Sequence, residues 1–323
     1  MTVKPDIRVL ITGGDGFVAP FAAKAIKHTL GNTRILFTAR RVVEPPTGCE
    51  FATLVVVDML TVSRILTEFR PTHVLHLAGI ASRGEAEANP VAAWNVNVSA
   101  TLSLAQNLRV ICPGASFIFA SSNQVYSGDC KGLISETASI APEGVYASTK
   151  AAADLALGAI ASDELRVVRF RPFNHTGPGQ SAAYAFGSFA NQIATIEAGP
   201  QSPIIRVGNL DVKRDFLDVR DVADAYVRGI TLSSNLPQDN IFNLASGKLH
   251  TIRELLNVML SHSTVKIEIL VDSELQRNNE IAAFAGNANA ARKLLNWNPT
   301  TPIETTLREM LDCARTKLFE KSV

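Results

Sequence analysis

Excess charge of one sign and long apolar runs are both missing from this sequence. Lys and Arg number 31 and Asp and Glu number 30, which gives a formal net charge of +1. This balance leaves no strong field to attract nucleic acid or an anionic membrane, so neither is an expected partner. No apolar run approaches the roughly 18 residues of a membrane span, and the N-terminus carries no signal-peptide pattern. We therefore expect a cytoplasmic protein.

Cysteine is also scarce, and its spacing argues against a metal centre. Cys49, Cys112, Cys130 and Cys313 lie far apart and fit neither a metal-ligand pattern nor a disulfide framework, which favours a reducing compartment. The 323 residues include 20 glycines, 15 prolines and 46% hydrophobic residues, which excludes a disordered or fibrous chain. At roughly 150 residues per domain, the length predicts about two domains or one domain with a large appendage.

Short apolar runs alternate with helical patterns through the first half of the chain. The predicted strands cover residues 7–12, 34–38, 54–58, 73–78, 116–121 and 166–170. The predicted helices cover residues 17–29, 62–69 with a cap at Thr61, 91–108 and 145–160. This alternation is typical of βαβ units around a buried parallel sheet. We predict an α/β fold with a doubly wound parallel sheet of the Rossmann type.

The pattern changes after residue 170. A Gly/Pro-rich loop at residues 175–187 precedes a mixture of helices and short strands, which ends in an apolar helix at residues 304–318. Residues 241–245 have the pattern of another core strand, so the first domain is expected to take back a late segment. We expect a Rossmann domain from residues 1–175 plus 212–246. A smaller, interleaved α/β substrate lobe, the second lobe, is expected from residues 176–211 plus 247–323.

The first predicted strand leads directly into a glycine-rich turn and a helix. The turn reads Thr12-Gly13-Gly14-Asp15-Gly16-Phe17-Val18-Ala19. Glycines let the backbone approach a pyrophosphate, whose charge is met by free N–H groups at the helix N-terminus. A tight turn without a ligand is the alternative, but it would not require glycine at three of four consecutive positions. The pattern predicts a dinucleotide-binding loop.

Two arginines follow the second predicted strand. Folds that bind NAD carry an acidic residue near this point for the ribose 2′-hydroxyl, whereas this chain has Arg40 and Arg41. Two guanidiniums suit a 2′-phosphate, so NADP (NADPH) is the predicted cofactor; the alternative is that both only solvate a loop. Asp58 ends the third predicted strand, where it would bond the adenine amino group or form an ordinary turn.

A tyrosine and a lysine stand four residues apart at the start of a predicted helix. Tyr146 and Lys150 therefore lie on one face, where an ammonium would lower the pKa of a phenol from about 10 and make it a usable proton donor. Ser121 and Ser122 end the fifth predicted strand, at the sheet edge that delivers side chains to a ligand. Ser122 would orient a carbonyl for Tyr146. A turn cap and a surface helix are the alternative interpretation.

These motifs occur over essentially the whole chain in the order of the extended short-chain dehydrogenase/reductase family, which the sequence resembles. The motifs are the glycine loop, Asp58-Met59, His76-Leu77-Ala78-Gly79, Asn97-Val98 with Thr101, Ser121-Ser122 with Val125-Tyr126, Tyr146/Lys150 and Arg214-Asp215-Phe216. Residues 171–180 and 207–211 resemble the branch of GDP-mannose 4,6-dehydratases and GDP-6-deoxy-4-keto-mannose reductases. Ala19 and Ala100 stand where the family usually has glycine.

The resemblance implies a role for each matching residue. Ser122, Tyr146 and Lys150 would form the catalytic triad, with Lys150 also holding the nicotinamide ribose. The implied substrate contacts are Ser122, Asn174, Arg214 and Arg277, although Arg277 lacks the proline that usually follows it. The implied cofactor contacts are Gly13, Gly16, Phe17, Val18, Arg40, Asp58, Met59, Leu77, Ala78, Gly79, Asn97, Ala120, Ser121, Tyr146, Lys150, Phe173 and His175. No metal is implied.

The function implied by the resemblance is NADPH-dependent reduction at carbon 4 of a GDP-linked 4-keto-6-deoxy sugar. A nucleotide-sugar 4-epimerase and a GDP-mannose 4,6-dehydratase are the alternatives among enzymes. The dehydratases carry a carboxylate just after the triad's Ser or Thr, whereas Asn123 and Gln124 follow Ser122 here. A non-catalytic NADP-sensing regulator is the alternative from another class, but it would be expected to lack the tyrosine or the lysine.

A homodimer is also expected. The predicted helices at residues 91–108 and 145–160 carry more apolar and small residues than a solvated face should. The resemblance implies that two copies pair these helices into a four-helix bundle. Burial within one chain is the competing explanation.

Overall fold

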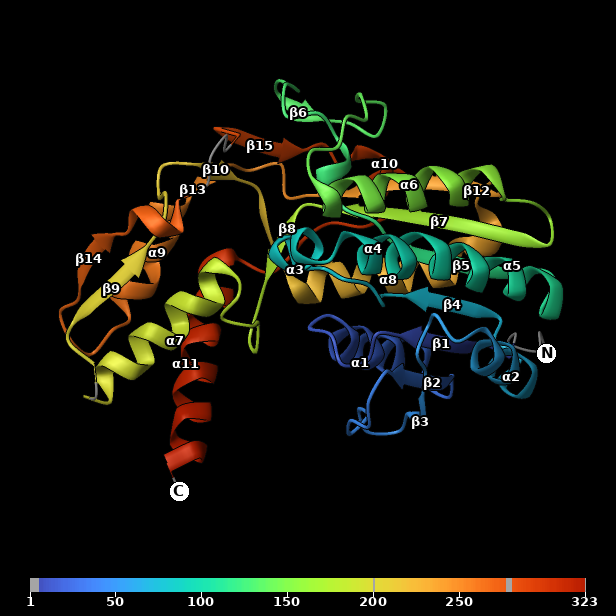
Figure 1. Ribbon diagram of the computed structural model, residues 1–323, viewed down its shortest axis with the longest axis horizontal. Coiled ribbons are helices and arrows are strands. Elements are labelled where there is room, and N and C mark those ends of the chain that lie inside the picture. Colours follow the sequence, from blue (N-terminus) through green and yellow to red (C-terminus); the bar gives the residue numbers. More distant parts are fainter. Residues whose placement is uncertain (1–5, 200, 277–280, 323) are drawn as a thin grey trace.

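A seven-stranded parallel sheet forms the centre of the protein (Figure 1). The computed structural model describes residues 6–199, 201–276 and 281–322, with side chains described up to residue 320. In spatial order the strands are β12 (Asp239–Leu244), β7 (Leu165–Pro172), β5 (Ala115–Ala120), β4 (His73–His76), β1 (Arg8–Thr12), β2 (Arg34–Ala39) and β3 (Glu50–Thr53). Every neighbouring pair is parallel. The predicted doubly wound sheet is confirmed, and so is the late strand at residues 241–245.

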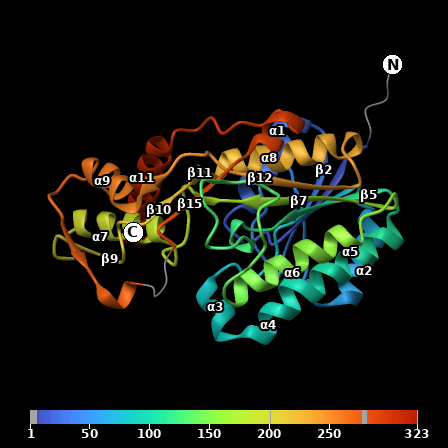
Figure 2. The same ribbon diagram turned by 90° about the horizontal axis from the view of Figure 1, so that it is seen from above.

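Helices cover both faces of this sheet (Figure 2). On one face lie α1 (Ala19–Leu30) and α8 (Val219–Leu232). On the other lie α2 (Met59–Phe69), α5 (Thr101–Ile111) and α6 (Val145–Ala159). Val9 and Ile11 of β1 belong to the first buried core and Leu10 to the second. This alternation follows from the two-residue period of a strand, and it explains why strands buried on both faces are continuously apolar.

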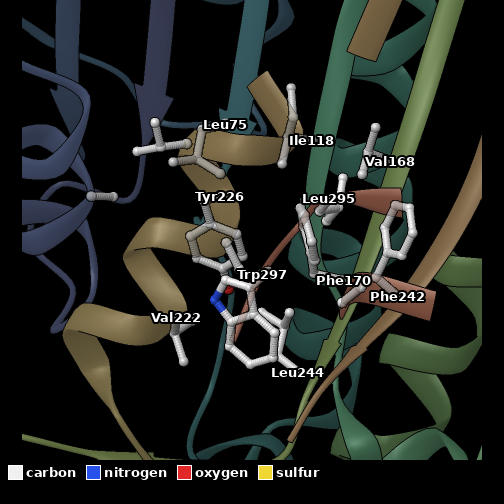
Figure 3. Close-up of a cluster of buried hydrophobic side chains, with 14 of the residues drawn as sticks. Leu75, Ile118, Val168, Phe170, Val222, Tyr226, Phe242, Leu244, Leu295 and Trp297 are labelled. Atoms are coloured by element: carbon white, nitrogen blue, oxygen red, sulfur yellow. The ribbon is translucent and has the colours of Figure 1, made fainter. Parts of the chain in front are cut away.

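An aromatic cluster fills the core between α8 and the sheet (Figure 3). The ring centroids of Phe170 and Tyr226 lie 5.3 Å apart, and those of Phe170 and Phe242 lie 5.7 Å apart. Trp297 is fully buried here, with Nε1 donating to the carbonyl of Asp221 at 2.9 Å. The predicted domain bounds stay a prediction, and the packing of Trp297 favours a Rossmann domain that also takes in a segment after residue 246.

The second lobe has its own core, built by three helices and a pair of parallel strands. Its elements are α7 (Ala185–Glu197), α9 (Ile252–Ser261), α11 (Ile303–Ser322), β9 (Ile204–Val207) and β14 (Glu268–Val271). The helix predicted at residues 304–318 corresponds to α11. The apolar side chains of this lobe form a cluster separate from the two cores of the sheet. Figure 1 shows the lobe to one side of the Rossmann domain.

Short strands connect the two parts of the molecule. One small sheet has the order β13 (His250–Thr251), β10 (Lys213–Arg214), β15 (Ala283–Gly286) and β6 (Leu133–Ile134). A second pairs β8 (Asn174–Thr176) with β11 (Phe216–Asp218) in parallel. The short helix α10 (Asn289–Leu294) follows β15. The late segments therefore return beside the end of β7, where the predicted site residues gather.

The prediction of a strand at residues 54–58 is wrong. The strand is β3 at Glu50–Thr53, and α2 begins directly after Asp58. Asp58 caps this helix, accepting from the N–H groups of Leu60 at 3.1 Å and Thr61 at 3.3 Å, so the predicted cap at Thr61 is also wrong. Alternating burial between residues 54 and 57 imitates a strand, but a carboxylate that satisfies free helix N–H groups decides the local structure.

The helix predicted at residues 91–108 is interrupted in its course. It runs through α4 (Pro90–Trp94), a π-helical turn at Asn95–Ala100 and α5. Before it lies α3 (Arg83–Ala88). Such π-helical turns are frequent at functional sites. Among the described residues, no helix is both long and apolar enough to cross a membrane.

A buried histidine ties two strands of the sheet to helix α5. His76, at the end of β4, places Nδ1 2.8 Å from the hydroxyl of Thr12 and Nε2 2.9 Å from that of Thr101. Burial, with a smaller contribution from the charge of Lys150, lowers the pKa of His76 to about 3. In the folded protein this imidazole therefore stays neutral over a pH range in which an exposed histidine takes up a proton.

We expect this histidine to make stability depend on pH. Because the folded pKa of about 3 lies below the ordinary value of 6.5, the unfolded chain binds the proton first as pH falls. The contribution of His76 to stability is complete above pH 6.5 and is lost between pH 6.5 and 3, with a loss of about 2 kcal/mol by pH 5. Urea unfolding at pH 7 and pH 5 should show a smaller pH dependence in His76→Gln. An equal loss in both proteins would contradict the expectation.

Candidate active site

The predicted dinucleotide loop connects β1 to α1. Gly13 has φ of +77°, and a Cβ there would lie 2.6 Å from the backbone nitrogen of Ala78, so glycine is required. The N–H of Gly14 donates to the carbonyl of Thr38 at 2.7 Å, and that of Gly16 donates to Gly13 at 2.9 Å. Among the described side chains none caps the N-terminus of α1, so its N–H groups are available to an anion. The loop has the form of a cradle for a phosphate group.

Both predicted phosphate-binding arginines lie beside this loop. Nε of Arg40 is 3.1 Å and Nε of Arg41 is 3.6 Å from the same carboxylate oxygen of Asp15. Since these contacts use Nε, each guanidinium keeps two terminal nitrogens as donors for a second anion. Their side chains are 67% and 72% exposed, which leaves them accessible. The arrangement suits a second phosphate next to the cradle.

An asparagine joins the predicted cofactor edge to the helix that carries Tyr146. Residues 77–79 follow β4, and Asn97 accepts the N–H of Ile80 at 2.8 Å and donates to its carbonyl at 3.1 Å. The same side chain donates to the hydroxyl of Thr149 at 3.0 Å, which in turn donates to the carbonyl of Tyr146 at 2.8 Å. Through these bonds, Asn97 fixes the segment after β4 relative to the first turn of α6.

Ser122, Tyr146 and Lys150 are brought together at the carboxyl end of β5. Ser122 follows that strand, and the other two come from the first turns of α6. Ser122 is buried and hydrogen bonds with Tyr146. Nζ of Lys150 donates to the carbonyl of Ala120 and lies 4.5 Å from the centroid of the Phe119 ring. A hydroxyl, a phenol and an amino group thus share one sheet edge.

Burial dominates the acid–base state of these groups. It raises the pKa of Tyr146 to about 12, opposed by the hydrogen bond with Ser122 and supported by the nearby phenol of Tyr184. Burial also lowers the pKa of Lys150 to about 8, against the charge of Asp154. The expected lowering of the phenol pKa is therefore wrong in this structure. The phenol is protonated at neutral pH, which makes it a proton donor.

A buried ion-pair network next to Ser122, Tyr146 and Lys150 was not predicted from the sequence. Asp154 is fully buried and accepts from Arg171 at 2.7 and 3.1 Å and from Arg169 at 3.0 Å. Burial raises the pKa of Asp154, but these guanidiniums outweigh it and hold the pKa below its ordinary value. The available signal was spacing, because a carboxylate four residues after Lys150 lies on the same helix face.

The predicted substrate side lies where β8 and β11 pair. Nδ2 of Asn174 donates to the carbonyl of Asp215 at 3.3 Å, and Nδ1 of His175 lies 3.1 Å from the carbonyl of Phe173. Burial lowers the pKa of His175. Arg214 is half-buried, and Nη1 donates at 2.9 Å to the carbonyl of the residue before it. These residues form a second group, which reaches the sheet edge from the end of β7.

Four further predicted cofactor contacts lie at the N-terminal ends of α1 and α2. Asp58 and Met59 begin α2, and the Asp58 carboxylate is occupied in capping that helix. Val18 precedes the first turn of α1, and the ring of Phe17 packs edge-on against Phe21 with centroids 5.7 Å apart. Arg277 lies outside the described residues.

Comparison with known proteins shows which family the chain matches. The model of the family described as GDP-mannose 4,6 dehydratase matches residues 10–310. The GDP-6-deoxy-D-mannose reductase of Pseudomonas aeruginosa is 34% identical over 254 residues, which cover 78% of this chain and 83% of that protein. The UDP-glucose 4-epimerase of Erwinia amylovora is 26% identical over 93% of this chain and 96% of its own length.

A solved structure agrees with the sequence relatives. RMD from Pseudomonas aeruginosa, complexed with NADPH, matches with a TM-score of 0.79 at 28% identity, covering 96% of this chain and 99% of that one. The predicted membership of the extended short-chain dehydrogenases/reductases is confirmed, since the family match covers most of the chain. The protein therefore belongs to the GDP-mannose 4,6 dehydratase family of extended short-chain dehydrogenases/reductases.

Proposed function

We propose that this protein reduces carbon 4 of a GDP-linked 4-keto-6-deoxy sugar with NADPH. The observation that carries the proposal is a protonated phenol, that of Tyr146, beside Ser122. The residues that follow Ser122 in the sequence are the amides Asn123 and Gln124 and not a carboxylate. Carbonyl reduction needs one proton donor, whereas a 4,6-elimination needs a further acid/base group. The 34% identical reductase supports this choice. We further propose a cytoplasmic location, which suits the four free cysteines.

The residues of the sheet edge divide the work. Ser122 would donate a hydrogen bond to the sugar carbonyl and hold it beside Tyr146, whose phenol would protonate the developing alkoxide. Lys150 would place positive charge beside the phenolate that remains. Asn174 and Arg214 would hold the diphosphate or the sugar. Donors fixed before the reaction stabilise the developing charge without reorganisation.

The cradle of the glycine loop fits a dinucleotide. A Cβ at Gly13 would collide with the Ala78 backbone, so the glycine leaves room for a close approach. The N-terminus of α1 would hold the pyrophosphate, and Arg40 and Arg41 would hold the 2′-phosphate. The bound cofactor would supply the hydride. The structure of RMD complexed with NADPH supports this assignment.

The test is turnover of defined sugar nucleotides. We expect GDP-4-keto-6-deoxy-mannose to be reduced with consumption of one NADPH per sugar, followed as a loss of NADPH absorbance. GDP-mannose should remain unchanged. Tyr146→Phe should lower kcat by about 10²- to 10⁴-fold, because it removes the proton donor. Chromatography with mass spectrometry would identify the product.

Other products would point to the rival functions. Loss of one water from GDP-mannose would place the protein among the dehydratases. Epimerisation without release of NADP+ would identify a 4-epimerase. NADPH binding with no turnover of any nucleotide sugar would support the regulator.

Cofactor preference tests the role of Arg40. We expect NADPH to bind much more tightly than NADH, and Arg40→Ala to weaken NADPH by about tenfold to a hundredfold, since a charge-assisted contact contributes about 1.5–3 kcal/mol. NADH affinity should hardly change. Arg34→Ala is a matched control at the other end of β2, where that arginine pairs with Glu50. Equal affinities for both cofactors in the unmodified protein would contradict the assignment.

We also propose that two copies pair through α4, α5 and α6. These helices form one outer layer of the molecule in Figure 2. They expose Val91 (70%), Trp94 (43%), Val110 (76%) and Leu155 (52%). Large apolar side chains gathered on one layer are typical of an interface. A second copy would cover them symmetrically.

Oligomeric mass tests this pairing. We expect light scattering to give twice the chain mass of 34.7 kDa at micromolar concentration. Leu155→Glu should shift the mass to that of one chain, because it places a charge in the apolar layer. Leu294→Glu changes a similarly exposed leucine on α10 and should leave the mass unchanged. A single-chain mass for the unmodified protein would exclude the dimer.

A further inference from the structure

The helix that carries Tyr146 begins without a capping side chain of its own. Gly144 is the N-cap of α6 and has φ of +85°. The first N–H groups of a helix lack partners within it, and a side chain at the N-cap usually satisfies one of them. Glycine has no such side chain to offer. The cap of α6 must therefore come from another part of the chain.

Helix α3 supplies that cap. Oε1 of Glu87 accepts the N–H of Val145 at 2.8 Å. A Cβ at Gly144 would lie 2.6 Å from this same oxygen, so the glycine makes room for the carboxylate. Nη2 of Arg83 donates to the carbonyl of Glu143 at 3.1 Å. Helix α3 thus holds the chain on both sides of Gly144.

The contact lies one residue before Tyr146. In addition, the hydroxyl of Thr149 donates to the Tyr146 carbonyl and itself accepts a hydrogen bond from Asn97. The first turn of α6 is therefore fixed by one bond from the π-helical turn and one from α3. The positive end of the helix dipole also favours a carboxylate at this place.

We propose that Glu87 is a positioning residue for Tyr146. By accepting the N–H of Val145, it sets the first turn of α6 and with it the direction of the phenol toward Ser122. The proposal rests on the proposed reductase function only for its kinetic effect. The structural part concerns the tyrosine itself and can be measured without turnover.

Three variants test the proposal in the full-length protein. Glu87→Ala removes the acceptor, and Glu87→Gln keeps an acceptor oxygen. Glu68→Ala, on α2, is the matched control, because it removes an exposed helical glutamate that contacts only Arg64 among the described hydrogen bonds and ion pairs. We expect Glu87→Ala to lower kcat by about fivefold to tenfold, which is the fold-change that corresponds to the free energy of a helix cap. The KM for NADPH should stay unchanged. Glu87→Gln should restore most of the kcat.

A readout without turnover uses the tyrosines. The chain has four, so protein labelled with ¹³C-tyrosine should give few ring signals, and Tyr146→Phe identifies the one of interest. We expect the Tyr146 signal to shift in Glu87→Ala and to stay in place in Glu87→Gln and Glu68→Ala. The shift would support the positioning role even if no nucleotide sugar were reduced, in which case only the proposed function would fail.

Several results would overturn the proposal. One is an unmoved Tyr146 signal with normal kcat in Glu87→Ala. Another is an equal loss of kcat in Glu87→Ala and Glu68→Ala. A third is a Glu87→Gln variant as impaired as Glu87→Ala, since an acceptor oxygen for the Val145 N–H would then not be enough to position Tyr146.

Discussion

The buried ion pair between Asp154 of α6 and Arg171 of β7 holds the helix of Tyr146 and Lys150 against the central sheet. Asp154 is 0% and Arg171 1% exposed, and buried charges are stable only when paired and hydrogen-bonded. Arg171 also donates to the hydroxyl of Tyr126 at 3.0 Å, in the segment that follows Ser122. One guanidinium therefore fixes the helix, the strand and the serine segment relative to one another, and the geometry of the proposed reaction depends on it.

This fixed arrangement also sets the charges at the site. Burial lowers the pKa of Lys150 to about 8, while the nearby carboxylate of Asp154 favours its charged form. Tyr146 has a pKa of about 12 and is therefore protonated at neutral pH. A phenol that holds its proton and hydrogen bonds with Ser122 can give that proton to a carbonyl. The site therefore presents a proton donor at neutral pH, as carbonyl reduction requires.

A second buried carboxylate, that of Asp215, ties the predicted substrate side to segments late in the chain. Asp215, fully buried, accepts from the N–H and hydroxyl of Ser246 at 2.9 and 2.6 Å, from Gly247 at 2.8 Å and from Gly286 at 3.2 Å. Burial alone would favour the protonated acid and raises the pKa of Asp215, although these four donors oppose it. Arg214, the neighbour of Asp215, is thereby tied to the loop after β12 and to β15. The proposed substrate contacts are placed by backbone bonds from segments far along the chain.

Local sequence patterns predict the alternation of strands and helices, the glycine loop and the common face of Tyr146 and Lys150. Each depends on residues a few positions apart, whose relation local geometry fixes. Tertiary structure decided that Glu87 caps α6 from 58 residues away, that Asp154 meets Arg171, and that burial rather than Lys150 sets the pKa of Tyr146. Those features require elements distant in the chain to meet, and burial exists only after they have packed. The local pattern also gave a wrong prediction at residues 54–58. The alternation there is typical of a strand, but the Asp58 carboxylate caps α2 and a helix begins at the next residue.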